Sequence, residues 1–196
     1  MLRAGLYKKA LVVGFETFNR LTLEHFHAMN LLAQNAPYQP FSEQNQGIVL
    51  GEGIGCVALT VEPAENVRQC EIIATSQLTD NHNLTNSQQS ALQQLVEQCL
   101  QNAQLTASQI QGVKVHAVGV ASDEMELAWL QRQFPQARWL LAKPYLGHTL
   151  GASGALETAW FWQMLQQQEL AAGYYLNYFI GFGGSNVAWI VKVDEE

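Results

Sequence analysis

Basic residues are scarce in this sequence of 196 residues, which has 10 Lys and Arg against 17 Asp and Glu. The formal net charge of -7 argues against electrostatic binding to nucleic acid or to an anionic lipid surface. No apolar run approaches the roughly 18 residues of a membrane-spanning helix. The apolar segment after the basic start is too short for a signal peptide. We therefore expect a cytoplasmic protein with no membrane span and no nucleic-acid partner.

Cysteine is equally sparse, and its spacing excludes two classes of site. Cys56, Cys70 and Cys99 lie far apart, and no CxxC pair occurs. The odd count and wide spacing argue against a disulfide framework and against a zinc site. Two of these residues fall in strand-like runs and the third on the apolar face of a helix. We expect all three to be buried free thiols that act as small hydrophobic groups, and we expect no metal site.

Helical and extended patterns alternate along the chain, and 48% of the residues are hydrophobic, which predicts one α/β domain with a layered sheet. Asp123 is the expected N-cap of the third helix, and Thr106 and Gln109 have the spacing of a capping box. The segment GFGGSN is typical of a tight hairpin between the last two strands. Strands are expected at 10–15, 70–77, 113–120, 139–142, 174–180 and 186–193 and in the second half of 47–62, and helices at 22–33, 87–102, 123–134 and 148–168, the last being the longest.

Four segments concentrate glycine where a packed helix or strand would not. They are GEGIG at 51–55, HAVG at 116–119, GHTLGASG at 147–154 and GFGGSN at 181–186. Glycine permits a positive φ and a close backbone approach, which is how loops direct amide groups at a ligand. None of the four matches a P-loop or a dinucleotide-binding fingerprint. Each segment alone also fits an ordinary turn, so only the four segments taken together, in their order along the chain, indicate a function.

That ordered set resembles a known family. The chain reads GIVLGEGIGCVALT, VHAVGVASDEME, KPYLGHTLGASGALE and GFGGSNVAWIV, which is similar to the C-terminal half of a β-ketoacyl-acyl-carrier-protein synthase, a condensing enzyme of fatty-acid and polyketide synthesis. Residues 10–41 resemble the end of the family's N-terminal half. The resemblance implies an α/β, thiolase-like fold: the C-terminal half of a layered αβαβα sandwich. It divides the chain into 1–62, a remnant of the N-terminal half, and 63–196, a C-terminal ketosynthase-like domain, packed as one unit.

The resemblance implies catalytic roles for four side chains. His148 matches the second active-site histidine, and His116 matches the first when HAVGV is laid on the family's HGTGT motif. A shift of two positions would instead place Val118 in that slot. Lys143 and Glu157 match the lysine before and the glutamate after the second histidine, and we expect them to pair, in a structural or a catalytic role. Neutral imidazoles at such a site would donate N–H to a thioester oxygen and stabilise the enolate left by loss of carbon dioxide.

The GFGG segment matches the family's oxyanion loop. Phe182 corresponds to the phenylalanine that borders the acyl pocket, Gly183 and Gly184 to the glycines whose backbone helps bind the oxyanion, and Asn186 to the asparagine that follows. A hairpin that needs glycine for a positive φ accounts for the same residues. Both interpretations stay open, because a turn can also lie at an active centre.

Two departures from the family matter. The family's nucleophile is a cysteine near the start of a helix in the N-terminal half, and none of the three cysteines here lies in a comparable motif. The two threonines of HGTGT, which hydrogen-bond a phosphopantetheine arm, are replaced by Val118 and Val120. The sequence therefore predicts a site without its own nucleophile and with a weakened contact to the carrier arm.

Three hypotheses follow. The chain is one component of a split ketosynthase whose partner subunit supplies the cysteine and the N-terminal half, or it is a non-catalytic accessory subunit, similar to a chain-length factor, that stabilises a full ketosynthase. The third is a truncated product that folds without activity. The first two imply a phosphopantetheine-linked acyl carrier protein as substrate carrier and no bound cofactor. The central helix would otherwise leave apolar surface exposed, so we expect a heterodimer or self-association.

Overall fold

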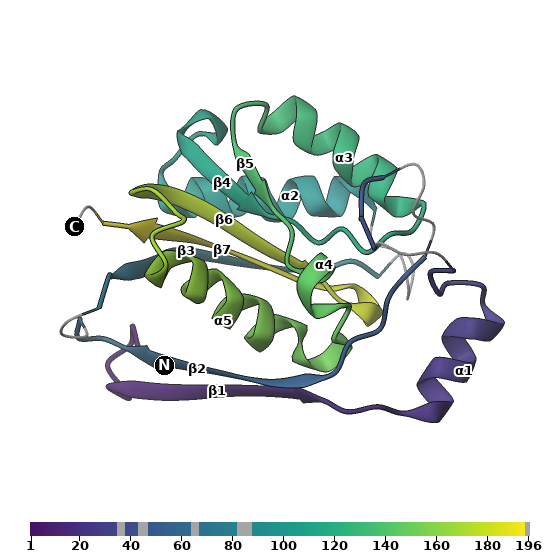
Figure 1. Ribbon diagram of the computed structural model, residues 1–196. Helices are drawn as coiled ribbons and strands as arrows, with labels where there is room; N and C mark the ends of the chain where they lie inside the picture. Colours follow the sequence, from purple (N-terminus) through teal and green to yellow (C-terminus); the bar gives the residue numbers. More distant parts are fainter. Residues whose placement is uncertain (35–37, 43–46, 64–66, 82–87, 195–196) are drawn as a thin grey trace.

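The computed structural model describes residues 1–34, 38–42, 47–63, 67–81 and 88–194. Its larger sheet has five strands in the order β3-β7-β6-β4-β5 (Figure 1). Strand β4 runs parallel to β5 and β6, whereas β7 is antiparallel to both β3 and β6. The strands are β3 (Cys70–Thr79), β4 (Ile110–Lys114), β5 (Arg138–Leu140), β6 (Gly173–Ile180) and β7 (Ser185–Val193).

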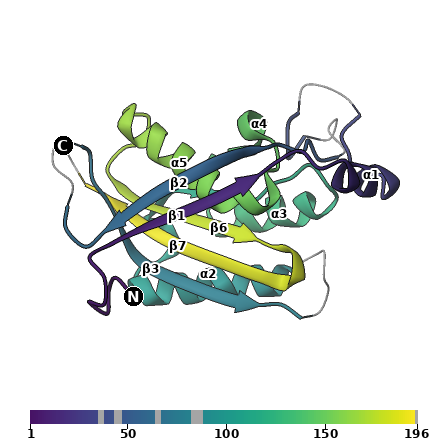
Figure 2. The same cartoon turned by 90° about the horizontal axis from the view of Figure 1, so that it is seen from below.

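The helices and a second sheet complete the layers. Strands β1 (Lys9–Glu16) and β2 (Gly53–Thr60) form an antiparallel pair, and helix α5 (Ser153–Gln166) lies between this pair and the larger sheet (Figures 1 and 2). Helices α2 (Gln89–Ala103) and α3 (Ser122–Gln133) cover the opposite face of the larger sheet. The order of layers is therefore two strands, one helix, five strands and two helices. The remaining elements are α1 (Arg20–Ala28), α4 (Lys143–Leu146) and the 3₁₀ turns η1 (Ala107–Gln109), η2 (Leu150–Ala152) and η3 (Phe182–Gly184).

Helix α5 is apolar on several sides because a sheet covers it on each of two sides. Phe161 and Leu165 pack on the larger sheet, against Tyr175 and Val191 among others. On the other side the helix meets two glycines, Gly14 and Gly55, which are paired across β1 and β2.

These glycines allow a close approach of backbone to helix. A Cβ atom added at Gly55 would lie 2.5 Å from the backbone nitrogen of Leu156, and one at Gly14 would lie 3.0 Å from the Cβ of Ala155. Any side chain at Gly55 would push the strand pair off the helix. Gly55, in the glycine-rich segment 51–55, therefore serves helix packing.

Several predicted elements have different bounds. The predicted helix 148–168 begins only at Ser153, and α2, with 15 residues against 14, is the longer helix. The reason is that His148 pairs with the 49–51 segment: its amide donates to Val49 O at 2.7 Å, and its carbonyl accepts from Gly51 N at 3.0 Å. Helix α1 ends at Ala28 rather than 33, and the predicted start of α2 at residue 87 lies outside the described residues.

The predicted strand 113–120 is also too long, since β4 ends at Lys114. Asp123 does not cap α3, because the N-cap residue is Ala121. The carboxylate of Asp123 instead accepts hydrogen bonds from the backbone amides of Val118 and Gly119. Amides bonded to side chains cannot take part in a sheet ladder, and this ends the strand. The predicted capping box between residues 106 and 109 is present.

The expectation of three buried thiols is wrong for one of them. Cys99 is buried in the core beneath α2 and Cys70 is half-buried, but Cys56 is exposed. Side chains alternate along a strand, so Cys56 points away from α5 because its neighbour Gly55 faces the helix.

The exposed apolar surface lies on the outer face of the β1–β2 pair and not on the central helix, where it was expected, because α5 is covered by a sheet on two sides. Its side chains Leu11, Val13, Phe15 and Ile54 are each more than half exposed. Within the described residues, neither edge of this pair is bonded to a third strand. An open two-stranded sheet with an apolar outer face is rarely stable in water on its own.

We expect the chain to associate through this face. Sedimentation at micromolar concentration should show a species larger than a monomer, and Ile54→Glu should shift the distribution towards the monomer by placing a charge in the contact. Leu21→Glu, at an equally exposed leucine on α1, is the matched control and should change nothing. A wild-type chain that sediments as a well-behaved monomer would contradict the expectation.

Candidate functional site

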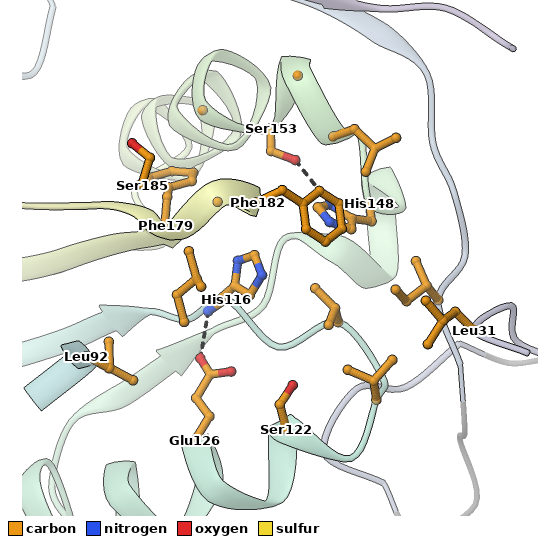
Figure 3. A pocket seen from close by; sticks show the side chains of 18 of the residues that line it. Leu31, Leu92, His116, Ser122, Glu126, His148, Ser153, Phe179, Phe182 and Ser185 are labelled. Carbon is orange, nitrogen blue, oxygen red and sulfur yellow. Dashed lines mark hydrogen bonds between the residues drawn. The ribbon is translucent and has the colours of Figure 1, made fainter. Parts of the chain in front are cut away.

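A cavity of about 940 Å³ opens between α1, the turn after β4, the start of α5 and the β6–β7 turn. Figure 3 shows the polar side chains within this otherwise apolar wall. His116, His148 and Phe182 line it, together with apolar side chains such as Phe26 and Leu92. Three of the four glycine-rich segments, 116–119, 147–154 and 181–186, therefore contribute to the wall of the cavity, whereas 51–55 does not.

The two histidines meet inside this cavity. Their ring centroids are 5.8 Å apart and the rings are nearly perpendicular, at 89°. Gly147, with a φ of +69°, turns the chain sharply just before His148. The hydroxyl of Ser153, at the start of α5, lies 3.4 Å from Nδ1 of His148 (Figure 3). Residues 32 apart in the sequence thus become one pair.

Two carboxylates on α3 hold the turn that carries His116. Glu126 accepts hydrogen bonds from the amides of His116 at 2.8 Å and Ala117 at 2.9 Å. Asp123 accepts from the next two amides, at 3.1 and 2.7 Å. The hydroxyl of Tyr178 also donates to Glu126. Four successive backbone amides are therefore bound by two carboxylates, and this fixes the His116 side chain at the cavity.

This support was not predicted, although its signal is present in the sequence. Asp123 and Glu126 are three residues apart in a predicted helix, a spacing that places both on one face of the helix. What the sequence does not show is that this face lies against the turn after β4.

The predicted pairing of Lys143 with Glu157 is present, at 2.8 Å between Nζ and Oε1. The sequence analysis missed a third member, Lys114, whose Nζ lies 2.7 Å from the other carboxylate oxygen. All three side chains are at most 2% exposed. Lys114 lies in none of the four glycine-rich segments, and its contact with Glu157 joins the end of β4 to α5, which only the tertiary structure shows. The site therefore holds two buried ammonium groups on one buried carboxylate.

These charges and the burial set the protonation of the site. Burial, reinforced by Lys143, lowers the pKa of His148 to about 3, and burial with the same lysine lowers the pKa of His116 well below its usual value. Burial alone would raise the pKa of Glu157, but Lys114 and Lys143 outweigh it and lower that pKa to about 2. At neutral pH the site thus contains two neutral imidazoles and an ionised carboxylate.

Of the predicted loop residues, only Phe182 lines the cavity. Its ring meets Phe26 edge to face, with centroids 6.4 Å apart. Gly183 and Gly184 both have positive φ, and a Cβ at Gly184 would lie 1.6 Å from Asp80 O. Asn186 is buried within β7. The hairpin predicted here is present, and packing accounts for Gly184.

The two valines in the turn after β4 belong to an apolar cluster. Val118 is buried with Phe26 and Ile48, and Val120 packs against them. Both valines line the cavity. This wall of the cavity therefore offers methyl groups where a polar ligand arm would need hydroxyls.

Metal ligands and membrane spans are two classes of feature that the described residues do not contain. No cluster of three or more His, Cys, Asp or Glu side chains among them is arranged to hold a metal ion. In the same part of the chain, no helix combines the length and apolar character needed to cross a bilayer.

The neutral histidines predict acid sensitivity. Between pH 7 and 5 a histidine in the unfolded chain takes up a proton, whereas His148 in the folded chain does not, so the free energy of unfolding falls as the pH falls. The loss is about 2 kcal/mol for such a histidine. Urea unfolding at pH 7 and pH 5 should show that the free energy of unfolding falls by about 2 kcal/mol less in His148→Gln than in the wild type. His27→Gln, at an exposed position on α1, is the control; equal pH dependence in wild type and His148→Gln would rule out the buried neutral state.

Comparison with known families matches both parts of the chain. Residues 70–176 match the beta-ketoacyl synthase C-terminal domain, and residues 1–64 match the beta-ketoacyl synthase N-terminal domain. A curated relative, nodulation protein E of Rhizobium leguminosarum bv. trifolii, is 28% identical over 144 residues, which are 69% of this chain and 36% of that protein.

Solved ketosynthases share the fold. A beta-ketoacyl synthase from Burkholderia phymatum STM815 superimposes with a TM-score of 0.81 at 21% identity, covering 99% of this chain and 57% of that one. A ketosynthase in complex with its chain length factor, from Xenorhabdus doucetiae, gives a TM-score of 0.82 at 22% identity over 98% and 55%. The chain therefore spans little more than half of these solved chains.

The fold predicted from the sequence motifs is confirmed by these structures. The C-terminal family model alone covers more than half of the sequence. With its thiolase-like fold, this chain belongs to the β-ketoacyl synthase family, the condensing enzymes of fatty-acid and polyketide synthesis.

Proposed function

We propose that this chain supplies the histidine side of a decarboxylative condensation site, and that a ketosynthase-like partner subunit supplies the cysteine nucleophile. The observation that carries the proposal is the pair of neutral histidines, 5.8 Å apart in a cavity and supported from behind by Lys143 and Glu157. A neutral imidazole carries one N–H group, which can donate a hydrogen bond to an oxygen as negative charge develops on it.

The chain's own cysteines do not serve this chemistry. Cys56 lies on the outer face of β2, Cys70 on β3, and Cys99 is buried beneath α2. None of the three lines the cavity. A nucleophile that reaches the histidine pair therefore comes from outside this sequence, as the split-enzyme hypothesis requires.

The reaction has two stages. The partner's cysteine loses its proton, and its thiolate attacks the acyl thioester of an acyl carrier protein. The phosphopantetheine sulfur leaves as a thiolate and takes up that proton. A malonyl thioester on a second carrier then loses carbon dioxide, and its electron pair forms an enolate. His116 and His148 donate hydrogen bonds to the enolate oxygen. The enolate carbon attacks the acyl-cysteine carbonyl, and the cysteine thiolate leaves.

The other predicted site residues have supporting roles in this proposal. Phe182 borders the acyl chain, and the turn at Gly183 and Gly184, which does not itself line the cavity, positions Phe182 for the second stage. Lys143 and Glu157 hold the wall behind the histidines, and Asn186 orders the strand that follows the loop. No metal or bound cofactor takes part.

A second candidate function is that of a non-catalytic accessory subunit, similar to a chain-length factor, that stabilises a full ketosynthase. The specific observation in its favour is the apolar wall of Val118 and Val120, which gives a pantetheine arm no hydroxyl to bind. The exposed apolar face of β1 and β2 supports a protein partner under either function. The division at residues 62 and 63, the cytoplasmic location and the heterodimer stay predictions.

Replacing His148 separates the two functions. In the complex purified with its native partner, His148→Ala should lower condensation of malonyl carrier protein at least 100-fold, because one of two donors to the enolate oxygen is lost. His27→Ala, outside the cavity, should leave the rate unchanged. Full activity of the His148→Ala complex would sink the catalytic proposal and favour the accessory function.

A further inference from the structure

Lys114 is a buried cation that the motifs of the sequence do not explain. It is the last residue of β4 and its side chain is 0% exposed. Its Nζ donates to Glu157 Oε2 at 2.7 Å and to the carbonyl of Tyr178 at 2.8 Å, and it lies 3.4 Å from the centroid of the Phe179 ring. Three interactions thus serve the three N–H groups of the ammonium.

The charges around Lys114 do not balance. Glu157 carries one negative charge but bonds both Lys114 and Lys143, one on each oxygen. The three ionic side chains of this cluster, Lys114, Lys143 and Glu157, therefore carry a net charge of +1. Glu126 and Asp123 on α3 keep their negative charges, but their oxygens face the backbone amides of the turn after β4 and not the two lysines.

Lys114 does not reach the cavity itself. The ring of Phe179 lies against its ammonium and also lines the cavity, and it stacks on Trp189 with centroids 4.8 Å apart. The influence of the lysine on the cavity must therefore pass through the electric field and through Glu157. Both histidines lie within the range of that field, since Lys114 contributes to lowering the pKa of each.

We propose that Lys114 is a positioning residue: by sharing Glu157 with Lys143, it leaves a net positive charge behind the histidine pair and makes that wall of the cavity favour a negatively charged oxygen. Under the proposed function, on which this last consequence rests, the oxygen is that of the enolate or of the malonyl carboxylate. The excess charge also opposes protonation of the imidazoles, which keeps them neutral donors.

Lys114→Met isolates this charge. Methionine has a similar length and no charge, and Glu157 keeps Lys143 as its partner, so no buried carboxylate is orphaned. Lys114→Gln removes the charge but retains hydrogen-bond donors. Lys192→Met is the matched control, because Lys192 is a half-exposed lysine on β7 that pairs with Asp194.

The test is a titration of the two imidazoles by ¹⁵N NMR between pH 2 and 8, in the chain with its native partner, because the range must extend below the pKa of His148. Both Lys114 variants should raise the pKa of His116 and of His148 by about one unit, and Lys192→Met should move neither. Unchanged imidazole pKa values in a folded Lys114→Met protein would overturn the proposal. A shift in only one of the two Lys114 variants would also overturn it, because both remove the same charge.

Two further measurements keep the outcome decisive. If neither variant folds, the wild-type imidazole signals are followed from pH 7 to 10, across the pKa of Lys114, which burial lowers to about 8; signals that stay constant would refute the proposal. The NMR result does not depend on turnover, so it holds even if His148→Ala shows the chain to be an accessory subunit. If the chain is catalytic, Lys114→Met should lower the rate of malonyl decarboxylation about 10-fold while cysteine acylation is unchanged.

Discussion

The buried carboxylate of Glu157 is the group on which the arrangement of the site depends. It projects from the central helix α5 and binds Lys114 at the end of β4 and Lys143 at the start of α4. The end of β4 in the larger sheet is thereby joined to α4 and α5, which follow it later in the sequence. Removal of Glu157 would leave two ammonium groups buried without a counter-charge, which is far more costly than removal of either lysine.

His116 is also held by buried carboxylates, which lie on α3 on the opposite side of the larger sheet. Glu126 and Asp123 bind four consecutive amides and end β4 at the point where the chain must turn into the cavity. The desolvation of these carboxylates is offset by hydrogen bonds from the backbone rather than by cations. The histidine pair therefore lies between two polar assemblies, one of which carries positive charge.

The chemistry of the cavity combines catalytic and apolar features. Neutral imidazoles and a cationic wall suit the stabilisation of an oxyanion, whereas Val118 and Val120 favour an apolar ligand over a hydroxyl-bound carrier arm. The exposed face of β1 and β2 requires a cover of complementary apolar surface. Both proposed functions meet that requirement with a protein partner, and they differ in whether that partner brings a cysteine to the histidines.

The sequence by itself determined the family, the α/β class, and the pairing of Lys143 with Glu157, because these depend on ordered local motifs and on hydrophobic periodicity. It misplaced the end of β4 and the start of α5, because hydrophobic periodicity does not show hydrogen bonds to side chains or to distant segments. The amides of Val118 and Gly119 donate to the Asp123 carboxylate, and the amide of His148 donates to Val49, which is far away in the chain. Only the tertiary structure decided that Lys114 joins the buried ion cluster. The charge of a lysine is evident from its letter, but its partner depends on which helix the sheet packs against.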